Sequence, residues 1–191
     1  MSNLFSFRGG NHGVWRVVRT ETLCGQALPL VDRVDIIQGD TPGSAAAWVL
    51  RGTVSNIRYA TGGELSTLKS VQAPIGRPEA TCAALIPIRK STAWWDLAQD
   101  ERRAIFEETS HHTAIGLDYL PQIARRLHHG RDLGEPFDFV TLFDYAPTHA
   151  SIFDEMLSRL RATHEWTFID REVDIRLERA DVQNTTNKGD C

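Results

Sequence analysis

The chain has 191 residues, a mass of 21.4 kDa and a formal net charge of -4, which is enough material for one sizeable core. Its 21 basic and 25 acidic residues are spread without long runs of one sign, so we expect no nucleic-acid partner. The N-terminal residues lack the apolar stretch of a secretory signal, and no segment has the composition of a bilayer span. We therefore expect no membrane partner either.

The three cysteines, Cys24, Cys82 and Cys191, are odd in number and far apart in the sequence. This pattern argues against a disulfide framework or a zinc site and suits a reducing compartment. Together with the missing secretory signal, it predicts a cytoplasmic protein. The polar C-terminal residues 181–191 are expected to form a disordered tail.

The N-terminal half, residues 1–78, has strand-like runs over 14–20, 33–39 and 46–60 but no strong amphipathic helix. The pattern in residues 79–180 is clearer. It predicts strands over 80–88, 123–129, 137–145 and 166–177, one helix or two abutting helices from residue 91 to about 113, and a helix over 148–163. The order βαββαβ is ferredoxin-like. We therefore predict an α+β fold, with an antiparallel β-sheet or barrel, helices on one face and a reduced, strand-rich N-terminal half.

Two neighbouring histidines, His111 and His112, fall at the C-terminal end of the first predicted helix of this domain. Both continue apolar stripes at helical spacing, so periodicity does not decide which of them faces the interior. A histidine at this end of a helix is also favoured by the helix dipole without any further role. The pair is therefore a candidate site, and helical spacing leaves open which of the two histidines faces the interior.

Two neighbouring arginines, Arg125 and Arg126, lie in the predicted strand 123–129. Successive side chains of a strand point to opposite faces, and alternation places Arg125 with Ile123 and Leu127 on the apolar face. A guanidinium on an apolar face needs an anionic partner or a ligand, because an unpaired buried charge is very costly. Arg125 therefore belongs either to a buried ion pair or to an anion-binding pocket.

The segment from residue 94 to residue 147, WWDLAQDERRAIFEETSHHTAIGLDYLPQIARRLHHGRDLGEPFDFVTLFDYAP, resembles the chlorite dismutase family, and the resemblance extends over most of residues 45–178. In that family a histidine on the inner helix ligates haem iron, and an arginine thirteen residues later projects over the opposite haem face. The spacing matches His112 and Arg125, whereas the same step from His111 ends at Ala124. The resemblance thus implies that His112 is the metal ligand and that Arg125 is catalytic.

The resemblance also assigns roles to residues outside this pair. Glu165 matches a glutamate that accepts a hydrogen bond from the iron-bound histidine, which fixes its tautomer. Gln72 matches a glutamine that holds the catalytic arginine in one orientation. Trp94 and Trp95 match a tryptophan pair, of which we expect one to form a wall of the haem site.

Weaker matches supply groups that could meet the haem propionates. Asn56 and Tyr59 are expected to do so by hydrogen bonds, and a cation of the pair Arg89-Lys90, with Arg89 preferred, by charge. Ordinary surface ion pairs explain the cation nearly as well.

The resemblance implies haem b as the cofactor and the conversion of chlorite to chloride and dioxygen through ferryl and hypochlorite intermediates. The short N-terminal half is similar to the shorter, dimeric branch of the family, so a homodimer is expected. The alternatives are a related haem enzyme, either a coproheme decarboxylase or a weak peroxidase, and a haem-binding protein without catalysis. The decarboxylase branch typically lacks the distal arginine, so Arg125 counts against it.

Overall fold

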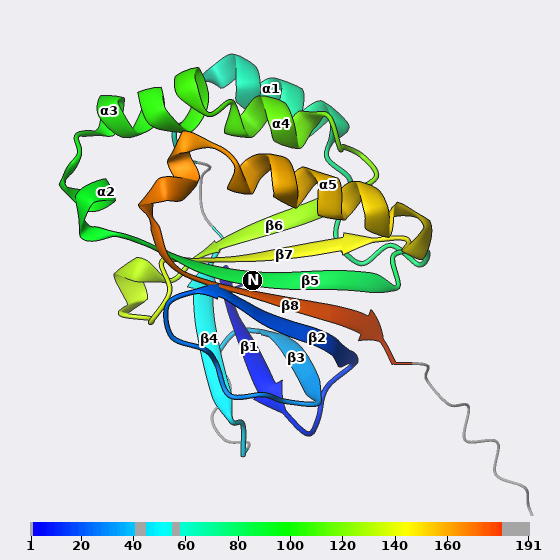
Figure 1. The fold of residues 1–191 in the computed structure, drawn as a ribbon. Helices are drawn as coiled ribbons and strands as arrows, with labels where there is room; N and C mark the ends of the chain where they lie inside the picture. The colour runs from blue at the N-terminus through cyan, green and yellow to red at the C-terminus, as the bar shows by residue number, and fades with distance from the viewer. Residues whose placement is uncertain (1, 41–44, 55–57, 181–191) are drawn as a thin grey trace, which may run out of the picture.

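The computed structural model describes residues 2–40, 45–54 and 58–180. Its antiparallel strands close into a barrel in the order β1-β3-β2-β8-β5-β7-β6-β4 (Figure 1). The strands are β1 (Leu4–Gly10), β2 (Trp15–Cys24), β3 (Arg33–Gln38), β4 (Trp48–Thr53), β5 (Cys82–Lys90), β6 (Ala124–His129), β7 (Phe139–Tyr145) and β8 (Ile169–Arg179). The α-helices are α1 (Gly62–Val71), α2 (Thr92–Asp96), α3 (Gln99–Arg103), α4 (His112–Leu117) and α5 (Ala150–Arg161).

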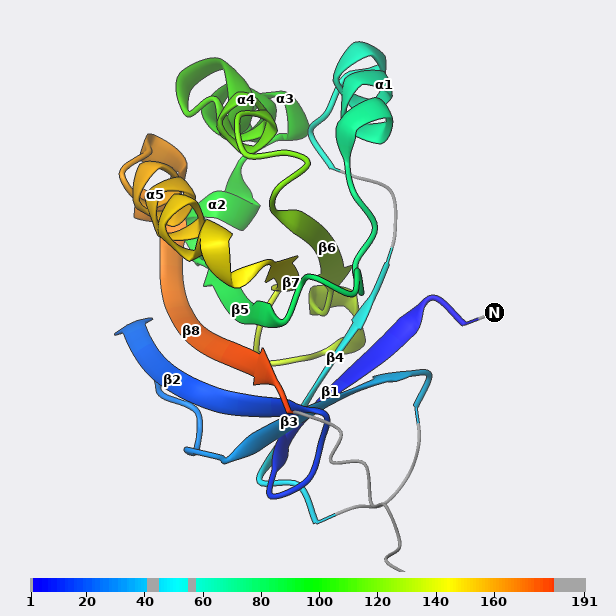
Figure 2. The same cartoon turned by 90° about the vertical axis from the view of Figure 1, so that its right-hand side faces the viewer.

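The predicted βαββαβ order of the second half is confirmed. Its strands lie in the order β6-β7-β5-β8, and β6 and β7 form the predicted antiparallel hairpin. Strands β1 to β4 complete the barrel, because β2 pairs with β8 and β4 pairs with β6. Figure 2 shows the helices over the side of the barrel formed by β5, β6 and β7. Strands from both halves close one barrel, so the structure does not separate the two predicted halves. The boundary near residue 78 stays a prediction.

Two elements of the N-terminal half were not predicted. Strand β1 begins at Leu4, in a segment whose glycines conceal its alternation. Helix α1 has only a weak apolar stripe, but its start is encoded locally. Thr61 accepts a hydrogen bond from the backbone N–H of Glu64, and the Glu64 carboxylate accepts one from the backbone N–H of Thr61. This T-x-x-E capping box was the overlooked sequence feature.

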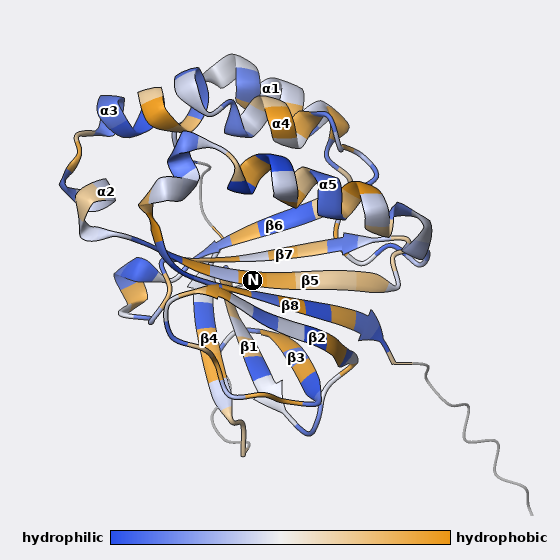
Figure 3. Ribbon diagram, in the orientation of Figure 1, coloured by the Kyte–Doolittle hydropathy of each residue, from blue (hydrophilic) through white to orange (hydrophobic). Residues whose placement is uncertain are grey.

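Alternation along the strands divides the apolar residues between two cores. In β5, Leu85 packs inside the barrel, whereas Ala84 and Ile86 pack outside it under the helices. The same division in β7 places Leu142 inside and Phe143 outside. Because both faces of β5 are covered, the strand is apolar along most of its length (Figure 3). The site described below lies in the outer core, between sheet and helices.

The long helix expected from residue 91 to about 113 is broken. Helices α2 and α3 are short, a π-helical turn spans Ala104–Thr109, and His111 adopts left-handed backbone angles with φ 53°. A new helix, α4, then begins at His112. His112 therefore lies at the N-terminal end of a helix, not at the C-terminal end that periodicity indicated. The dipole argument for a positive histidine does not apply there.

The last strand also begins later than expected, at Ile169. Residues His164–Phe168 form a 3₁₀ turn instead, so the aromatic residues Trp166 and Phe168 precede the strand. The predicted tail, residues 181–191, lies outside the described residues. No helix among the described residues is long and apolar enough to cross a membrane.

His128 is a fully buried histidine inside the barrel, and we expect it to make stability depend on pH. Its Nδ1 lies 2.9 Å from the carbonyl oxygen of Val140, and its Nε2 accepts a hydrogen bond from Arg126 at 3.2 Å. Burial lowers the pKa of His128 to about 4, and the nearby Arg126 charge adds to this effect. The native protein therefore contains a neutral imidazole at this position.

Because its folded pKa lies below its unfolded value of 6.5, this imidazole stabilises the fold fully above pH 6.5, and the stabilisation is lost as pH falls toward 4. Between pH 8 and pH 5 we expect the free energy of unfolding to fall by roughly 2 kcal/mol through this group. Urea unfolding of the parent and His128→Gln measures the difference. The exposed His12→Gln variant is the control and should retain the parent's pH dependence. Equal slopes in the parent and His128→Gln would contradict the assignment.

Candidate functional site

A cavity lies between the outer face of β5, β6 and β7 and the helices α4 and α5. Its walls are mostly apolar, with Ile86, Ile88 and Phe143 on the sheet side and Leu157 and Leu160 on α5. Polar and charged side chains from the sheet, the helices and the loops line the remainder. A mostly apolar cavity with some polar groups is the usual form of a cofactor or small-molecule site.

His112 projects into this cavity from the first turn of α4. Glu107, in the preceding π-helical turn, accepts hydrogen bonds from the backbone N–H groups of Thr113 at 2.6 Å and Ala114 at 3.2 Å, which caps the new helix. His112 Nδ1 lies 2.6 Å from Glu165 Oε2. This bond occupies Nδ1 and leaves Nε2 for a ligand in the cavity. His111 is exposed, so the tertiary structure selects His112.

Glu165 is held by two partners, His112 and Lys90, and the pairing with Lys90 was not predicted. Lys90 Nζ lies 2.7 Å from Glu165 Oε1, and both side chains are almost fully buried. Burial by itself would raise the pKa of Glu165, but attraction to His112 and Lys90 and their hydrogen bonds lower it to about 2. Burial lowers the pKa of Lys90, and its pairing with Glu165 opposes this effect. The carboxylate is thus ionised at neutral pH and accepts from both partners.

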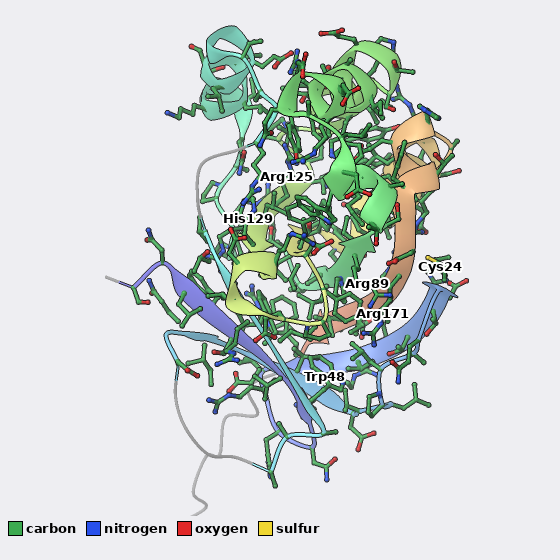
Figure 4. All side chains as sticks on the ribbon, turned by 90° about the vertical axis from the view of Figure 1, so that its left-hand side faces the viewer. Cys24, Trp48, Arg89, Arg125, His129 and Arg171 are labelled. Carbon is green, nitrogen blue, oxygen red and sulfur yellow. The ribbon has the colours of Figure 1, made fainter. Side chains whose placement is uncertain are left out.

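Strand alternation correctly placed Arg125 on the cavity face of β6, together with Ile123 and Leu127. Burial lowers the pKa of its guanidinium, and no neighbouring charge contributes to that shift. In the described part of the chain no carboxylate pairs with it, which removes the buried ion pair left open by the sequence. Figure 4 shows Arg125 beneath the helices. Arg126 also borders the cavity, but its guanidinium lies 4.1 Å from the Phe5 ring centre.

Gln72, at the C-terminal end of α1, lines the same cavity. Its side-chain amide donates to the backbone carbonyl of Arg125 at 2.9 Å. The hydrogen bond therefore holds the strand at Arg125 and not the guanidinium itself. Control of the guanidinium by Gln72 stays a prediction.

Three buried polar atoms on cavity-lining residues have no hydrogen-bond partner among the described residues. They are Tyr59 Oη, Trp94 Nε1 and His129 Nδ1. Buried donors without partners are rare, so a ligand that accepts hydrogen bonds is the simplest explanation. Tyr59 and Trp94 were expected here. His129 was not predicted, although strand alternation places it on the same face of β6 as Arg125 and Leu127.

Two further candidates, Trp95 and Arg89, lie away from the cavity. Trp95 Nε1 donates to Asp138 at 3.1 Å, and Trp95 does not line the cavity. Trp94 is therefore the member of the tryptophan pair that forms part of the cavity wall. Arg89 points outward from β5 and pairs with Asp170 at 2.8 Å (Figure 4). The expectation that Arg89 meets a propionate is wrong, because Lys90, and not Arg89, lies on the cavity face of β5. Asn56 lies outside the described residues.

Comparisons with known proteins agree with this geometry. The family model described as chlorite dismutase matches residues 45–178. A dimeric chlorite dismutase from Nitrobacter winogradskyi has 53% sequence identity and a TM-score of 0.86, covering 92% of this chain and 99% of that one. A mutant chlorite dismutase from Candidatus Nitrospira defluvii has 19% identity and a TM-score of 0.66 over 93% of this chain and 92% of that one, which supports the fold alone.

A chlorite dismutase from Ideonella dechloratans is 34% identical over 62 residues, which are 32% of this chain and 20% of that protein. The matched part therefore spans only a fifth of this curated relative. The family model nevertheless covers more than half of the chain, and it includes His112, Arg125 and Glu165. The chain belongs to the chlorite dismutase family.

Proposed function

We propose that this protein is a haem-b enzyme that converts chlorite to chloride and dioxygen. The observation that carries the proposal is a partly buried Arg125, without a carboxylate partner among the described residues, in the same cavity as a histidine whose Nδ1 is held by an ionised carboxylate. The first group suits a small anion, and the second suits a metal ligand. The reaction balances as one chlorite ion giving one chloride ion and one dioxygen molecule.

The residues of the cavity fit a haem. Among the described residues no cluster of three or more His, Cys, Asp or Glu side chains could hold a metal ion, whereas a porphyrin supplies four ligands itself and needs one from the protein. His112 Nε2 is that ligand in our proposal. The unpartnered donors of Tyr59, Trp94 and His129 suit the carboxylates of the porphyrin, and the apolar walls suit its ring.

When bound, the haem would supply an iron centre able to take up and release an oxygen atom. The chain's own groups bind and orient the reactants around it. Glu165 keeps the proton on Nδ1 of His112 and makes the imidazole a stronger donor through Nε2. Lys90 holds that carboxylate in place.

Arg125 draws chlorite into the cavity by charge and offers planar paired donors to its oxygens. The same contacts would hold the chlorine-containing part of chlorite while both Cl–O bonds break and the O–O bond forms, after which chloride and dioxygen leave. The apolar walls exclude water during this interval. No external reductant is needed, because the four electrons that take chlorine from the +3 to the −1 state come from the two oxygens, which go from −2 to 0 in dioxygen.

Adding chlorite to haem-loaded protein in an oxygen electrode tests the proposal. We expect one dioxygen per chlorite and chloride as the other product. Haem binding without oxygen release would reject it. In that case, loss of propionate carboxyl groups from coproheme would indicate a decarboxylase, and peroxide-dependent dye oxidation would indicate a peroxidase.

We also propose that the protein is a homodimer. The Nitrobacter relative is described as dimeric, and this chain covers 99% of it. Light scattering of the purified protein should give about twice 21.4 kDa. A monomeric or pentameric mass would contradict the expectation. Location in a reducing compartment stays a prediction from the cysteine pattern.

A further inference from the structure

Two aromatic rings lie nearly parallel to the imidazole of His112. The Phe106 ring centre is 4.3 Å from the imidazole centre with an angle of 20° between the planes. The Trp166 indole is 6.2 Å away with an angle of 18°. The hydrogen bond to Glu165 fixes the edge of the imidazole but leaves its tilt about that bond free. Parallel rings against its faces restrict the tilt.

The Trp166 indole is itself anchored by a buried ion pair. Its Nε1 donates to Glu172 Oε2 at 2.8 Å, and Glu172 is only 2% exposed. The other oxygen of Glu172 accepts from Arg161 Nε at 2.8 Å and Nη2 at 2.7 Å. Arg161 Nη2 also reaches Asp174 Oδ2 at 3.1 Å. Two donors on one oxygen and the indole N–H on the other leave the Glu172 carboxylate little freedom, and the indole follows it.

This anchor joins three elements at the cavity. Arg161 is the last residue of α5, Glu172 belongs to β8, and Trp166 lies in the 3₁₀ turn between them. The same turn presents Glu165 to the edge of His112 and Trp166 to its face. A displacement of the turn would therefore disturb both contacts together, unless the anchor fixes the turn.

We propose that Arg161, Glu172 and Trp166 form a positioning unit that sets the plane of the His112 imidazole and so directs its Nε2. The direction of Nε2 matters because the proposed function makes this nitrogen the iron ligand, and the inference rests on that assignment. The three residues act through His112 and are not catalytic themselves. Removing the indole N–H or the charge of Glu172 should loosen the ligand without removing it.

The test uses full-length, haem-loaded protein with the variants Trp166→Phe and Glu172→Gln. The readouts are the iron–histidine stretching band of the reduced protein and the rate of haem transfer to apomyoglobin. We expect a shifted and broadened band and roughly tenfold faster transfer in both variants, as for other partners of metal ligands. A shift in Trp166→Phe without one in Glu172→Gln would overturn the role of the anchor.

Trp48→Phe is the matched control. Trp48 is a buried tryptophan whose Nε1, like that of Trp166, has an acceptor: it donates to the carbonyl oxygen of Pro29 at 3.1 Å inside the barrel, away from His112. We expect it to lower stability in urea as Trp166→Phe does, while the haem band and the transfer rate stay at parent values. Equal band positions and transfer rates in the parent and Trp166→Phe would overturn the proposal.

Failure of the proposed function can be told apart from failure of the positioning unit. If the parent binds no haem, the positioning unit is tested in the haem-free protein by the NMR signal of the His112 Nδ1 proton. A sharp signal in the parent that broadens in Trp166→Phe, but not in Trp48→Phe, would support the unit. An unchanged signal would overturn it.

Discussion

His112→Ala is expected to lose haem or to hold it only loosely. The reason is that, in our proposal, His112 would supply the protein's one bond to the haem iron, while Glu165 and Lys90 act only through His112. Its replacement also leaves the buried Glu165 carboxylate without one of its two partners, which costs stability as well. Titration with haem, followed by the Soret band, measures the affinity.

The neighbouring His111 provides the control for this loss. It is exposed, and it has left-handed backbone angles at the start of α4. His111→Asn should therefore keep haem binding, and asparagine is chosen because it tolerates those angles better than alanine. A tightly bound, spectrally unchanged haem in His112→Ala would remove the central assignment.

Arg125→Ala should keep the fold and the haem but lose most of the oxygen-forming activity. Without the guanidinium, the cavity loses the unpaired charged donors that hold the chlorine-containing fragment, since its other lysine and arginine side chains have partners of their own. Loss of one charge-assisted hydrogen bond costs roughly 1.5–3 kcal/mol, or about ten- to a hundredfold in a rate that depends on it. Oxygen yield per chlorite and the lifetime of the Soret band, measured together, should both fall.

Arg125→Lys should restore only part of the rate, because an ammonium keeps the charge but does not offer planar paired donors. Arg159→Ala is the surface control, since Arg159 pairs with Asp118 on the exposed side of α5. Arg126→Ala is a poorer control than alternation suggested, because Arg126 also borders the cavity and donates to His128. An Arg125→Ala variant equal to the parent in yield, rate and haem lifetime would exclude the distal role.

The sequence alone determined the features that depend on local periodicity. Apolar alternation and helical spacing gave the βαββαβ order, because side chains of strands and helices repeat at different periods. Alternation also turned Arg125 inward, since a strand has only two faces. The family resemblance then related Arg125 to His112 by spacing.

Only the tertiary structure decided how distant segments meet. Periodicity expected His112 at a helix C-terminus, whereas the left-handed His111 starts a new helix, which the nearby Glu107 caps and whose His112 the distant Glu165 contacts. Lys90 is one step from Arg89 in the sequence, and alternation puts it on the cavity face of β5 with Ile86 and Ile88. Its partner Glu165 comes from the distant turn His164–Phe168, which only the folded chain brings to it. Such choices depend on which groups find partners after folding, and a local pattern does not contain that information.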